Sequence, residues 1–430
     1  MSLKKPIRLI MSLKSKLNSY KTLIESIFSL SILKSLNILL PLVTLPYLLR
    51  VVGAANYGVY SFIFVLIQYL LLITSYGFNY SATKQISLNR NNQGVVNKVF
   101  NSVFACRFIL LLLGLIIFFL LSPILLRSKD EKSMFIMGLG IVIGDILNPV
   151  WLFQGTEKMR YMTIVNLFSK LVFTILIFVF IREASDYLEI ILFNSLGSIL
   201  SGVLSIFIAR HQFKIHFQLP TWEEIKIQFR EGFTLFCSTI GINLYDNSNI
   251  FILKFFVDDS LIGIYSAAEK IIKGLKLLGS PISQALFPHL GNNFKNKTNK
   301  ESLLQLFKAG LLFSIFLLII SLGTFIFADL LIRIFGGTQY IEGIKIIRIM
   351  CITILLGGLN SLLGFSGLVN LNRQKDFMIG VFISGIFCII FQIIFIPVGG
   401  IIIAAWASVL SEVILLTVIL VSLYKINKRQ

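Results

Sequence analysis

The stretch IYSAAEKIIKGLKLLGSP, residues 264–281, places several ionisable side chains inside a long apolar region of this 430-residue chain. Glu269, Lys270, Lys273 and Lys276 fall within eight residues, and at about 100° of rotation per residue they share one side of a helix. Three ammonium groups against one carboxylate leave a surplus of positive charge, which in a membrane requires water or an anion. The pattern predicts a cationic wall that attracts an anion such as a phosphate or pyrophosphate; the alternative is a buried ion-pair network.

Other ionisable residues also fall within apolar segments. Arg107 and Asp145 lie at similar predicted depths, which favours an ion pair between them. Lys254 is expected to extend toward a lipid headgroup. Besides the three lysines of 264–281, the candidates for binding a substrate in a cationic cavity are Lys34, Arg50 and Arg107, and the candidates for coupling an ion are Asp145, Asp246, Glu269 and Glu412. Of the acids, Asp246 could pair with Lys270 or Lys273, whereas Glu412 has no obvious partner in the sequence.

The composition indicates a helical membrane protein. Hydrophobic residues make up 56% of the chain and charged residues only 14%, whereas a soluble domain carries about 25% charged residues. Runs such as 109–126 and 313–328 are almost continuously apolar, and roughly 20 such residues cross a bilayer as a helix. The apolar pattern is continuous rather than alternating, which excludes a β-barrel. The expected fold class is therefore an all-α polytopic membrane protein.

Twelve transmembrane helices are expected, with both termini in the cytoplasm. Their predicted ranges are 24–50, 57–80, 98–122, 133–153, 162–181, 188–209, 231–257, 260–287, 303–327, 341–364, 377–397 and 400–424. Lys and Arg are several times more numerous in the segments assigned to the cytoplasmic side than in the opposite loops, as the positive-inside rule requires. The net charge of +19 is then a signal of topology and lipid anchoring. It gives little reason to expect a nucleic-acid partner.

A short motif occurs twice and suggests two parallel repeats. Gly-Val-Tyr-Ser at 58–61 follows Arg50 and a short loop, and Gly-Ile-Tyr-Ser at 263–266 follows Lys254 in the same way. An even number of helices per repeat gives two six-helix lobes around a central cavity. The predicted organisation is a basic cytoplasmic or interfacial segment 1–23, an N-lobe 24–209, a cytoplasmic linker 210–230, a C-lobe 231–424 and a cytoplasmic tail 425–430.

The sequence offers little support for catalysis. It contains no G-x-x-x-x-G-K-[ST] motif, and its three histidines lack the spacing of metal ligands. The four cysteines lie in apolar segments without paired spacing and are expected to be free. No sizeable segment outside the membrane is available for catalytic groups. We therefore expect a protein that is not an enzyme and that has no metal and no cofactor.

Three segments resemble the polysaccharide-transport flippases, which belong with the multidrug/oligosaccharidyl-lipid/polysaccharide exporters. These segments are LPYLLRVVGAANYGVYSF (45–62), PVWLFQGTEKMRYMTIVNLFSK (149–170) and GIYSAAEKI (263–271), the last followed by LFPHL (286–290). In this resemblance Arg50 matches a basic position that closes the first helix of related flippases, and Lys254 is its equivalent in the second repeat. The second predicted helix is apolar where relatives carry an acid.

The resemblance implies a multi-pass protein of the bacterial inner membrane that moves a lipid-linked substrate. That substrate is an undecaprenyl-pyrophosphate-linked oligosaccharide of O-antigen, capsule or exopolysaccharide, carried from the cytoplasmic to the periplasmic leaflet by alternating access. The coupling ion would be H⁺ or Na⁺, and the expected partners are membrane lipid and other polysaccharide assembly proteins. A drug or cation antiporter of the same fold and a peptidoglycan lipid II flippase are the alternatives.

Overall fold

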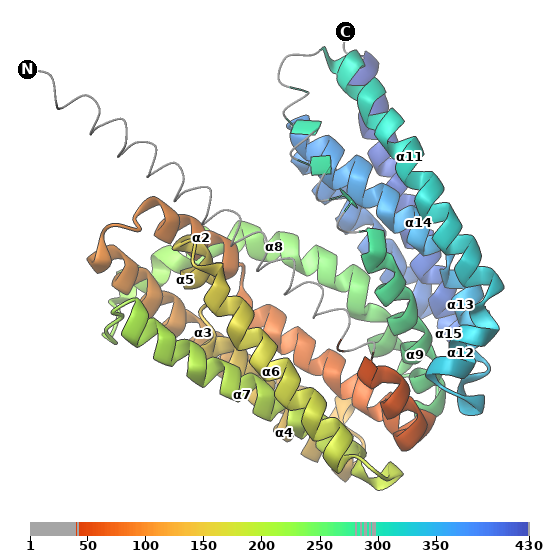
Figure 1. Cartoon of the computed structure of the whole chain (residues 1–430), viewed down its shortest axis with the longest axis horizontal. Coiled ribbons are helices and arrows are strands. Elements are labelled where there is room, and N and C mark those ends of the chain that lie inside the picture. The colour runs from red at the N-terminus through yellow and green to blue at the C-terminus, as the bar shows by residue number, and fades with distance from the viewer. Residues whose placement is uncertain are drawn as a thin grey trace, which may run out of the picture. The chain divides into compact units, whose positions relative to one another are not determined.

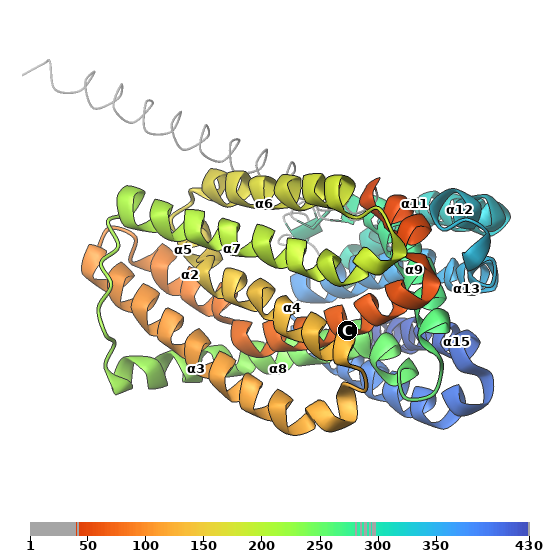
Figure 2. The same cartoon turned by 90° about the horizontal axis from the view of Figure 1, so that it is seen from below.

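The computed structural model describes residue 40 and residues 43–428, with gaps at 280–281, 284–285, 288–289, 292–293 and 295–297. The side chains of 238, 242–246, 299 and 427 are also not described. Throughout these ranges the regular structure is helical, as the composition predicts (Figures 1 and 2). The described chain divides into two compact units: the first contains 67–179 and 189–236, and the second contains the described residues of 43–66, 180–188 and 237–428.

The first unit begins with the helical residues 67–75 and adds the helices that follow them. These are α2 (Phe78–Leu88), α3 (Gln93–Leu125), α4 (Lys129–Leu147), α5 (Val150–Gly155), α6 (Met159–Phe180), α7 (Tyr187–Gln212) and the start of α8 (Trp222–Leu253). Helices α6 and α7 run side by side in both views (Figures 1 and 2). Gly197 of α7 permits this approach, because a Cβ there would meet the backbone carbonyl oxygen of Ser169.

Local sequence explains where several of these helices begin. Ser128 caps α4 by accepting a hydrogen bond from the backbone N–H of Glu131, whose side chain in turn accepts from Ser128. This capping box satisfies backbone donors that have no partner within the helix. Asn92 caps α3 by accepting a hydrogen bond from the backbone N–H of Val95. One end of the unit is closed by a buried cluster rich in aromatic residues, which includes Phe78, Phe100, Trp151, Phe153 and Phe213.

The second unit holds the helical residues 43–66, the end of α8, and the remaining helices. These are α9 (Asp259–Lys276), α11 (Asn299–Ile326), α12 (Ala328–Phe335), α13 (Gly343–Met350), α14 (Ile352–Leu359), the π-helix η4 (Asn360–Leu368) and α15 (Gln374–Lys428). Short 3₁₀ turns η1 (Ala184–Asp186), η2 (Leu277–Gly279) and η3 (Thr338–Tyr340) complete it. Helix α9 packs against α13, α14 and α15.

Two glycines with positive φ separate helices that the sequence predicts to be distinct. Gly53 has φ 77° between the predicted helices 24–50 and 57–80, and Gly400 has φ 55° within α15. Gly400 lies at the predicted boundary between 377–397 and 400–424, three residues after the helix-breaking Pro397. Positive φ is readily adopted by glycine, so both breaks have a local cause in the sequence.

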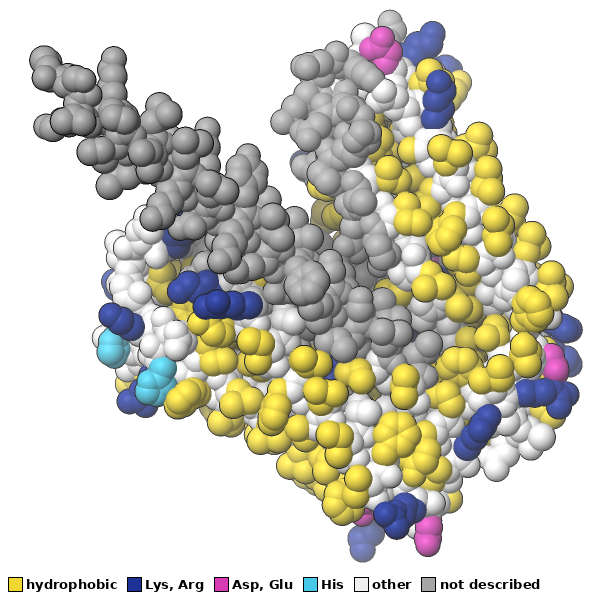
Figure 3. All heavy atoms as spheres, viewed as in Figure 1, with side chains coloured by type: hydrophobic (Ala, Val, Ile, Leu, Met, Phe, Trp, Pro, Cys, Tyr) yellow, Lys and Arg dark blue, Asp and Glu magenta, His cyan; other side chains and the backbone are white. Residues whose placement is uncertain are grey.

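Eight helical segments of the described chain are long and apolar enough to cross a membrane. Two of them, Val43–Leu88 and Gln374–Ile426, contain the glycine breaks and are longer than one crossing requires. Apolar side chains cover the visible faces of α6, α7 and α11, and Lys and Arg gather toward helix ends (Figure 3). Such faces suit contact with lipid. The prediction of a polytopic helical membrane protein is confirmed, and the number of twelve helices, the two lobes and the orientation of the termini stay predictions.

Candidate functional site

The two copies of the repeated motif contact each other within the second unit. A Cβ at Gly58 would overlap the carbonyl oxygen of Asp259, and a Cβ at Gly263 would overlap that of Ala54. The hydroxyls of Ser61 and Ser266 are hydrogen-bonded at 2.8 Å. The contacts are reciprocal. Matching positions in the two copies are 205 residues apart, so Gly58 corresponds to Gly263 and Ala54 corresponds to Asp259. The sequence repeat therefore has a local structural counterpart, in which glycine brings two helix backbones into direct contact.

Lys270 lies one turn beyond this crossing, among aromatic side chains of the other helix. Its ammonium group donates a hydrogen bond of 2.7 Å to the hydroxyl of Tyr57. It also lies 4.9 Å from the ring centre of Tyr57, 5.3 Å from Tyr60 and 5.9 Å from Phe64. Cations are attracted to aromatic ring faces within about 6 Å. This aromatic cage therefore stabilises the charge of Lys270.

Lys273 is paired with Glu269 one turn earlier on α9. Their charged atoms are 3.3 Å apart, an i, i+4 pair in the favourable order of acid before base. The Glu269 side chain is 5% exposed and that of Lys273 is 43% exposed. The ammonium group therefore lies toward the accessible side while the carboxylate is enclosed.

Lys276 is paired with a residue far away in the sequence, Glu412 of α15. Lys276 Nζ is 2.8 Å from Glu412 Oε1, and the amide of Asn360 donates to Glu412 Oε2 at 2.7 Å. The side chain of Glu412 is 6% exposed and that of Lys276 is 30% exposed. Gly357 leaves room for the pair, because a Cβ there would meet Glu412 Oε1. Glu412 is thus the partner that the sequence did not reveal.

These contacts revise the charge balance expected for α9. The sequence predicts three lysines against one carboxylate, whereas the structure supplies a second carboxylate from α15 and an aromatic cage. We refer to Lys273, Lys276, Glu269 and Glu412 as the paired stripe. Both of its lysines are partly exposed, and both carboxylates are buried. Ion pairs and an accessible cationic side therefore occur together, although the sequence presents them as alternatives.

In the first unit, Arg107 and Asp145 form the ion pair that their depths predict. The guanidinium also donates to the backbone carbonyl oxygens of Asp145, at 2.9 Å, and of Thr74, at 3.3 Å. Its remaining face lies 5.2 Å from the ring centre of Trp151. The Arg107 side chain is only 2% exposed, so this cation is enclosed by its partners.

Arg50 and Lys254 also have protein partners. Arg50 donates at 2.6 Å to the carbonyl oxygen of Ile334 and at 3.3 Å to that of Arg333, which are unsatisfied acceptors at the end of α12. Lys254 does not extend to the surface: it is 5% exposed and lies 2.6 Å from Asp259. The expectation of a headgroup contact for Lys254 is wrong, because opposite charges flank the short turn 255–258 and attract each other across it.

Two predicted site residues cannot be placed. Lys34 lies outside the described residues, and so does the side chain of Asp246, although its backbone belongs to α8. Among the described residues there is no cluster of His, Cys, Asp or Glu that could hold a metal ion.

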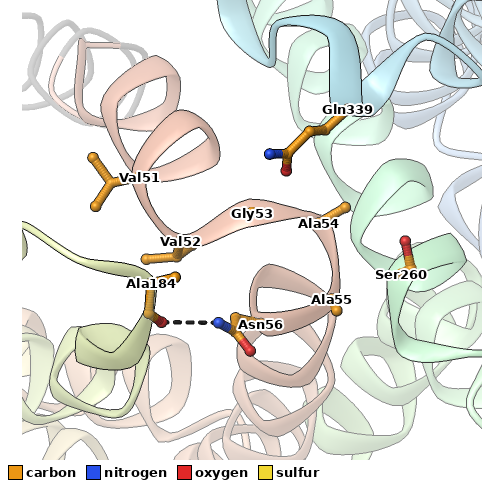
Figure 4. Close-up of a pocket in the computed structure, with 9 residues that line it drawn as sticks. All are labelled: Val51, Val52, Gly53, Ala54, Ala55, Asn56, Ala184, Ser260 and Gln339. Atoms are coloured by element: carbon orange, nitrogen blue, oxygen red, sulfur yellow. Dashed lines mark hydrogen bonds between the residues drawn. The ribbon is translucent and has the colours of Figure 1, made fainter.

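A cavity of about 440 Å³ lies beside the turn between the first two predicted helices (Figure 4). It is lined by Val51, Val52, Gly53, Ala54, Ala55, Asn56, Ala184, Ser260 and Gln339. The Asn56 amide donates at 2.8 Å to the carbonyl oxygen of Ala184, which also lines the cavity. The lining contains no charged side chain, so this cavity lacks the cations that the sequence predicts for a phosphate site.

Outside the predicted spans, Asp186 shows how backbone groups fix a loop carboxylate. It accepts hydrogen bonds from the backbone N–H groups of Arg182, at 2.8 Å, and Glu183, at 2.9 Å. These donors favour the charged form and lower the pKa of Asp186 below its usual value.

Known proteins are similar to this chain over most of its length. Residues 23–294 match the family of polysaccharide biosynthesis proteins. The chain belongs to this family. Two relatives carry the name "Putative O-antigen transporter": one from Escherichia coli K12 is 29% identical, covering 82% of this chain and 85% of the relative, and one from Shigella dysenteriae is 27% identical, covering 74% and 78%.

Solved structures share the fold. A lipid II flippase, MurJ, in an inward closed conformation has a TM-score of 0.71 at 15% identity, covering 93% of this chain and 87% of its own. An inward-facing multidrug resistance transporter of the MATE family, within the MOP superfamily, has a TM-score of 0.68 at 13% identity, covering 91% and 99%. Together with the apolar helices, these findings indicate a multi-pass protein of the bacterial inner membrane, and they confirm the predicted family.

Proposed function

We propose that this protein is a flippase for undecaprenyl-pyrophosphate-linked oligosaccharides of O-antigen, capsule or exopolysaccharide. It moves them from the cytoplasmic to the periplasmic leaflet by ion-coupled alternating access. The observation that carries the proposal is the paired stripe, in which the ammonium groups of Lys273 and Lys276 are partly exposed and their carboxylates are buried. The names of the E. coli and Shigella relatives support the substrate class.

The pyrophosphate binds to Lys273 and Lys276, which supply charge-assisted hydrogen bonds. Arg50 and Arg107 already have structural partners, and Lys270 is enclosed in its aromatic cage. The sugars occupy water and the prenyl tail stays in lipid. Lys34 and Asp246 remain predicted contributors, and H⁺ or Na⁺ and other polysaccharide assembly proteins remain predicted partners. The twelve-helix arrangement in two lobes, 24–209 and 231–424, belongs to this proposal.

An antiporter for drugs or other cations is the alternative from the same fold, and the MATE neighbour is the reason to consider it. A cationic substrate requires acids that are free to bind it. Glu269 and Glu412 are instead each paired with a lysine. The contacts of the paired stripe therefore favour an anionic substrate. A lipid II flippase would use the same pyrophosphate chemistry and differs in the sugars that it accepts.

The test replaces Lys273 and Lys276 together by glutamine and measures surface polysaccharide per inserted molecule in a host that lacks its own flippase. We expect the double variant to restore little or no surface polysaccharide. Lys170→Gln, a lysine of α6 outside the stripe, is the matched control and should restore it. A parallel test in a host depleted of its lipid II flippase separates the two lipid-linked substrates. Full restoration by the double variant would contradict the proposed anion site.

A further inference from the structure

The carboxylate of Glu412 is placed so that a proton can replace Lys276 as its partner. Its carboxylate is nearly fully buried, whereas its partner Lys276 is partly exposed and can turn outward. Asn360, at the first position of the π-helix η4, donates to both Glu412 Oε2 and the Glu412 backbone carbonyl oxygen. π-Helical segments of this kind are frequent at functional sites. The carboxylate is thus held in place independently of Lys276.

The side-chain oxygen of Asn360 is a hydrogen-bond acceptor that has no donor in the described structure. Asn360 Oδ1 is buried and has no hydrogen-bond partner in the described structure, although the Nδ2 of the same amide contacts Glu412. An unsatisfied buried acceptor is costly and therefore calls for a physical cause. A carboxylic acid and an amide are complementary, because the amide N–H donates to one oxygen and the acid O–H donates to the amide oxygen. A protonated Glu412 would supply the missing donor.

We propose that anion binding draws Lys276 away from Glu412 and that Glu412 then accepts one proton from water. This inference rests on the proposed function, because the anion is the pyrophosphate of the lipid-linked substrate. In the exchange, the Lys276 ammonium keeps its protons and moves its ion pair from the carboxylate to a phosphate oxygen. Glu412 becomes a neutral acid whose O–H donates to Asn360 Oδ1. A buried carboxylate that loses its cation is strongly unfavourable, so the two events are linked.

The surroundings of Glu412 allow this assignment among the described residues. Helix α9 contributes Lys276, η4 contributes the uncharged Asn360, and α14 contributes Gly357. The next charged groups on α9, Lys273 and Glu269, pair with each other. Of the other helices that pack against α15, α13 carries Lys345 and Arg348, whose guanidinium lies over the ring of Phe325, and α11 carries Lys300, Glu301 and Lys308. Helix α8 also contacts α15, through Asn249 and Ser408, and it carries Asp246, whose side chain lies outside the described residues. Among the described residues, Glu412 is therefore the buried acid that pairs with Lys276.

The experiment measures proton uptake when the purified, full-length protein binds farnesyl pyrophosphate. Titration calorimetry in two buffers with different ionisation enthalpies gives the number of protons taken up per ligand. The wild type should take up about one proton more than Glu412→Gln, because the probe's own ionisation is common to both. Lys276→Gln should also lack this extra proton, since an unpaired Glu412 is already protonated before the probe arrives.

Three further variants test whether the extra proton resides on Glu412 itself. Asn360→Leu should bind the probe but shift the pH at which the proton is taken up, because the acid loses its acceptor. Asp329→Asn, which removes an exposed acid outside the paired stripe, is the control and should retain the extra proton; Glu269→Gln tests whether the proton resides on the other stripe acid instead. Uptake that is equal in wild type and Glu412→Gln, or that disappears in Glu269→Gln instead, would overturn the inference while leaving the anion site intact. A wild type that fails to bind the probe would overturn the proposed function and this inference with it.

Discussion

Two ion pairs inside this protein differ in how completely their cations are enclosed. Arg107 is 2% exposed and is held by a carboxylate, two carbonyl oxygens and the face of Trp151. Lys276 is 30% exposed, and its partner among the described residues is one carboxylate oxygen of Glu412. In the first pair the carboxylate is the more exposed member; in the second it is the buried one.

This difference separates a structural pair from an exchangeable one. A planar guanidinium with several fixed acceptors loses much if any of them is exchanged for a ligand. An ammonium group with one partner on its buried side can offer its other protons to a phosphate. Burial of a charge in a predicted span therefore does not by itself identify a binding residue. The number and placement of its partners determine whether the charged group is structural or can bind a ligand.

Replacing both members of each ion pair should give the largest difference in transport between the two pairs. Replacing a buried pair by uncharged residues is often nearly neutral for stability, since no lone charge is left behind. Arg107→Met with Asp145→Asn should therefore keep transport, whereas Lys276→Gln with Glu412→Gln should lower it about tenfold or more, as expected for losing one charge-assisted contact. Surface polysaccharide per inserted molecule measures both. Equal transport in the two double variants would remove the distinction between the pairs.

Breaking the structural pair on one side should destabilise the fold. Asp145→Ala leaves the buried guanidinium of Arg107 without its carboxylate, at a cost of about 3 kcal/mol. The expected result is a lower melting temperature of the detergent-solubilised protein, with transport reduced only in proportion to the folded fraction. The control is Asp329→Asn, which breaks an exposed pair with Arg333 and should change the melting temperature little. A stable Asp145→Ala that fails to transport would point to a functional role for this pair.

Two substitutions separate the contributions of the hydrogen bond and of the aromatic rings to the stability of the cage around Lys270. Tyr57→Phe removes the hydrogen bond to Lys270 but keeps the ring, so a loss of about 1.5–3 kcal/mol in stability is expected for a bond to a charged group. Tyr60→Leu removes one ring face and should cost less, about 0.5–2 kcal/mol of the cation–π contact beyond the lost packing. Thermal unfolding of the two variants, with Lys270→Met as the reference, measures these contributions. If the cage acts through Lys270, the effect of Tyr57→Phe should disappear in the Lys270→Met background and that of Tyr60→Leu should fall to the cost of lost packing; undiminished effects in that background would contradict the cage.

The smallest effect is expected at Asp186, a carboxylate held by backbone donors rather than by a cation. Its lowered pKa means that its stabilising contribution is present at neutral pH and is lost as the pH falls below 3.8, the usual value, toward the folded pKa. Asp186→Asn should lower the melting temperature slightly at pH 7, and the difference from wild type should vanish in acid. A difference that grows in acid would contradict this sign.

Features encoded by neighbouring residues could be predicted from the sequence. The break at Gly400 follows Pro397, and the stripe on α9 follows from helical periodicity. The short helix α12 lies between the predicted spans 303–327 and 341–364, where the sequence leaves room for a short interfacial helix. The pair of Arg107 and Asp145 could be predicted from their depths in the membrane, because each lies in a long, regular helix in which position along the chain determines depth.

Contacts between distant segments could not be predicted in this way. Glu412 and Lys276 are 136 residues apart, and Tyr57 and Lys270 are 213 apart. Nothing local specifies which faces of these helices meet, because that depends on the packing of the whole unit. The reciprocal contact of the two Gly-[Val/Ile]-Tyr-Ser copies was marked by the repeat itself, but only the fold shows that they contact each other.

The central claim is that the paired stripe is accessible and binds an anion, whereas the Arg107 pair is closed. The most direct measurement places a single cysteine at each position, Lys273→Cys and Arg107→Cys, after replacement of Cys106, Cys237, Cys351 and Cys388. A water-soluble methanethiosulfonate is then applied with and without farnesyl pyrophosphate. The account predicts rapid labelling at 273 that the pyrophosphate slows, and little labelling at 107. Equal labelling at the two positions, or labelling at 273 that ignores the pyrophosphate, would contradict it.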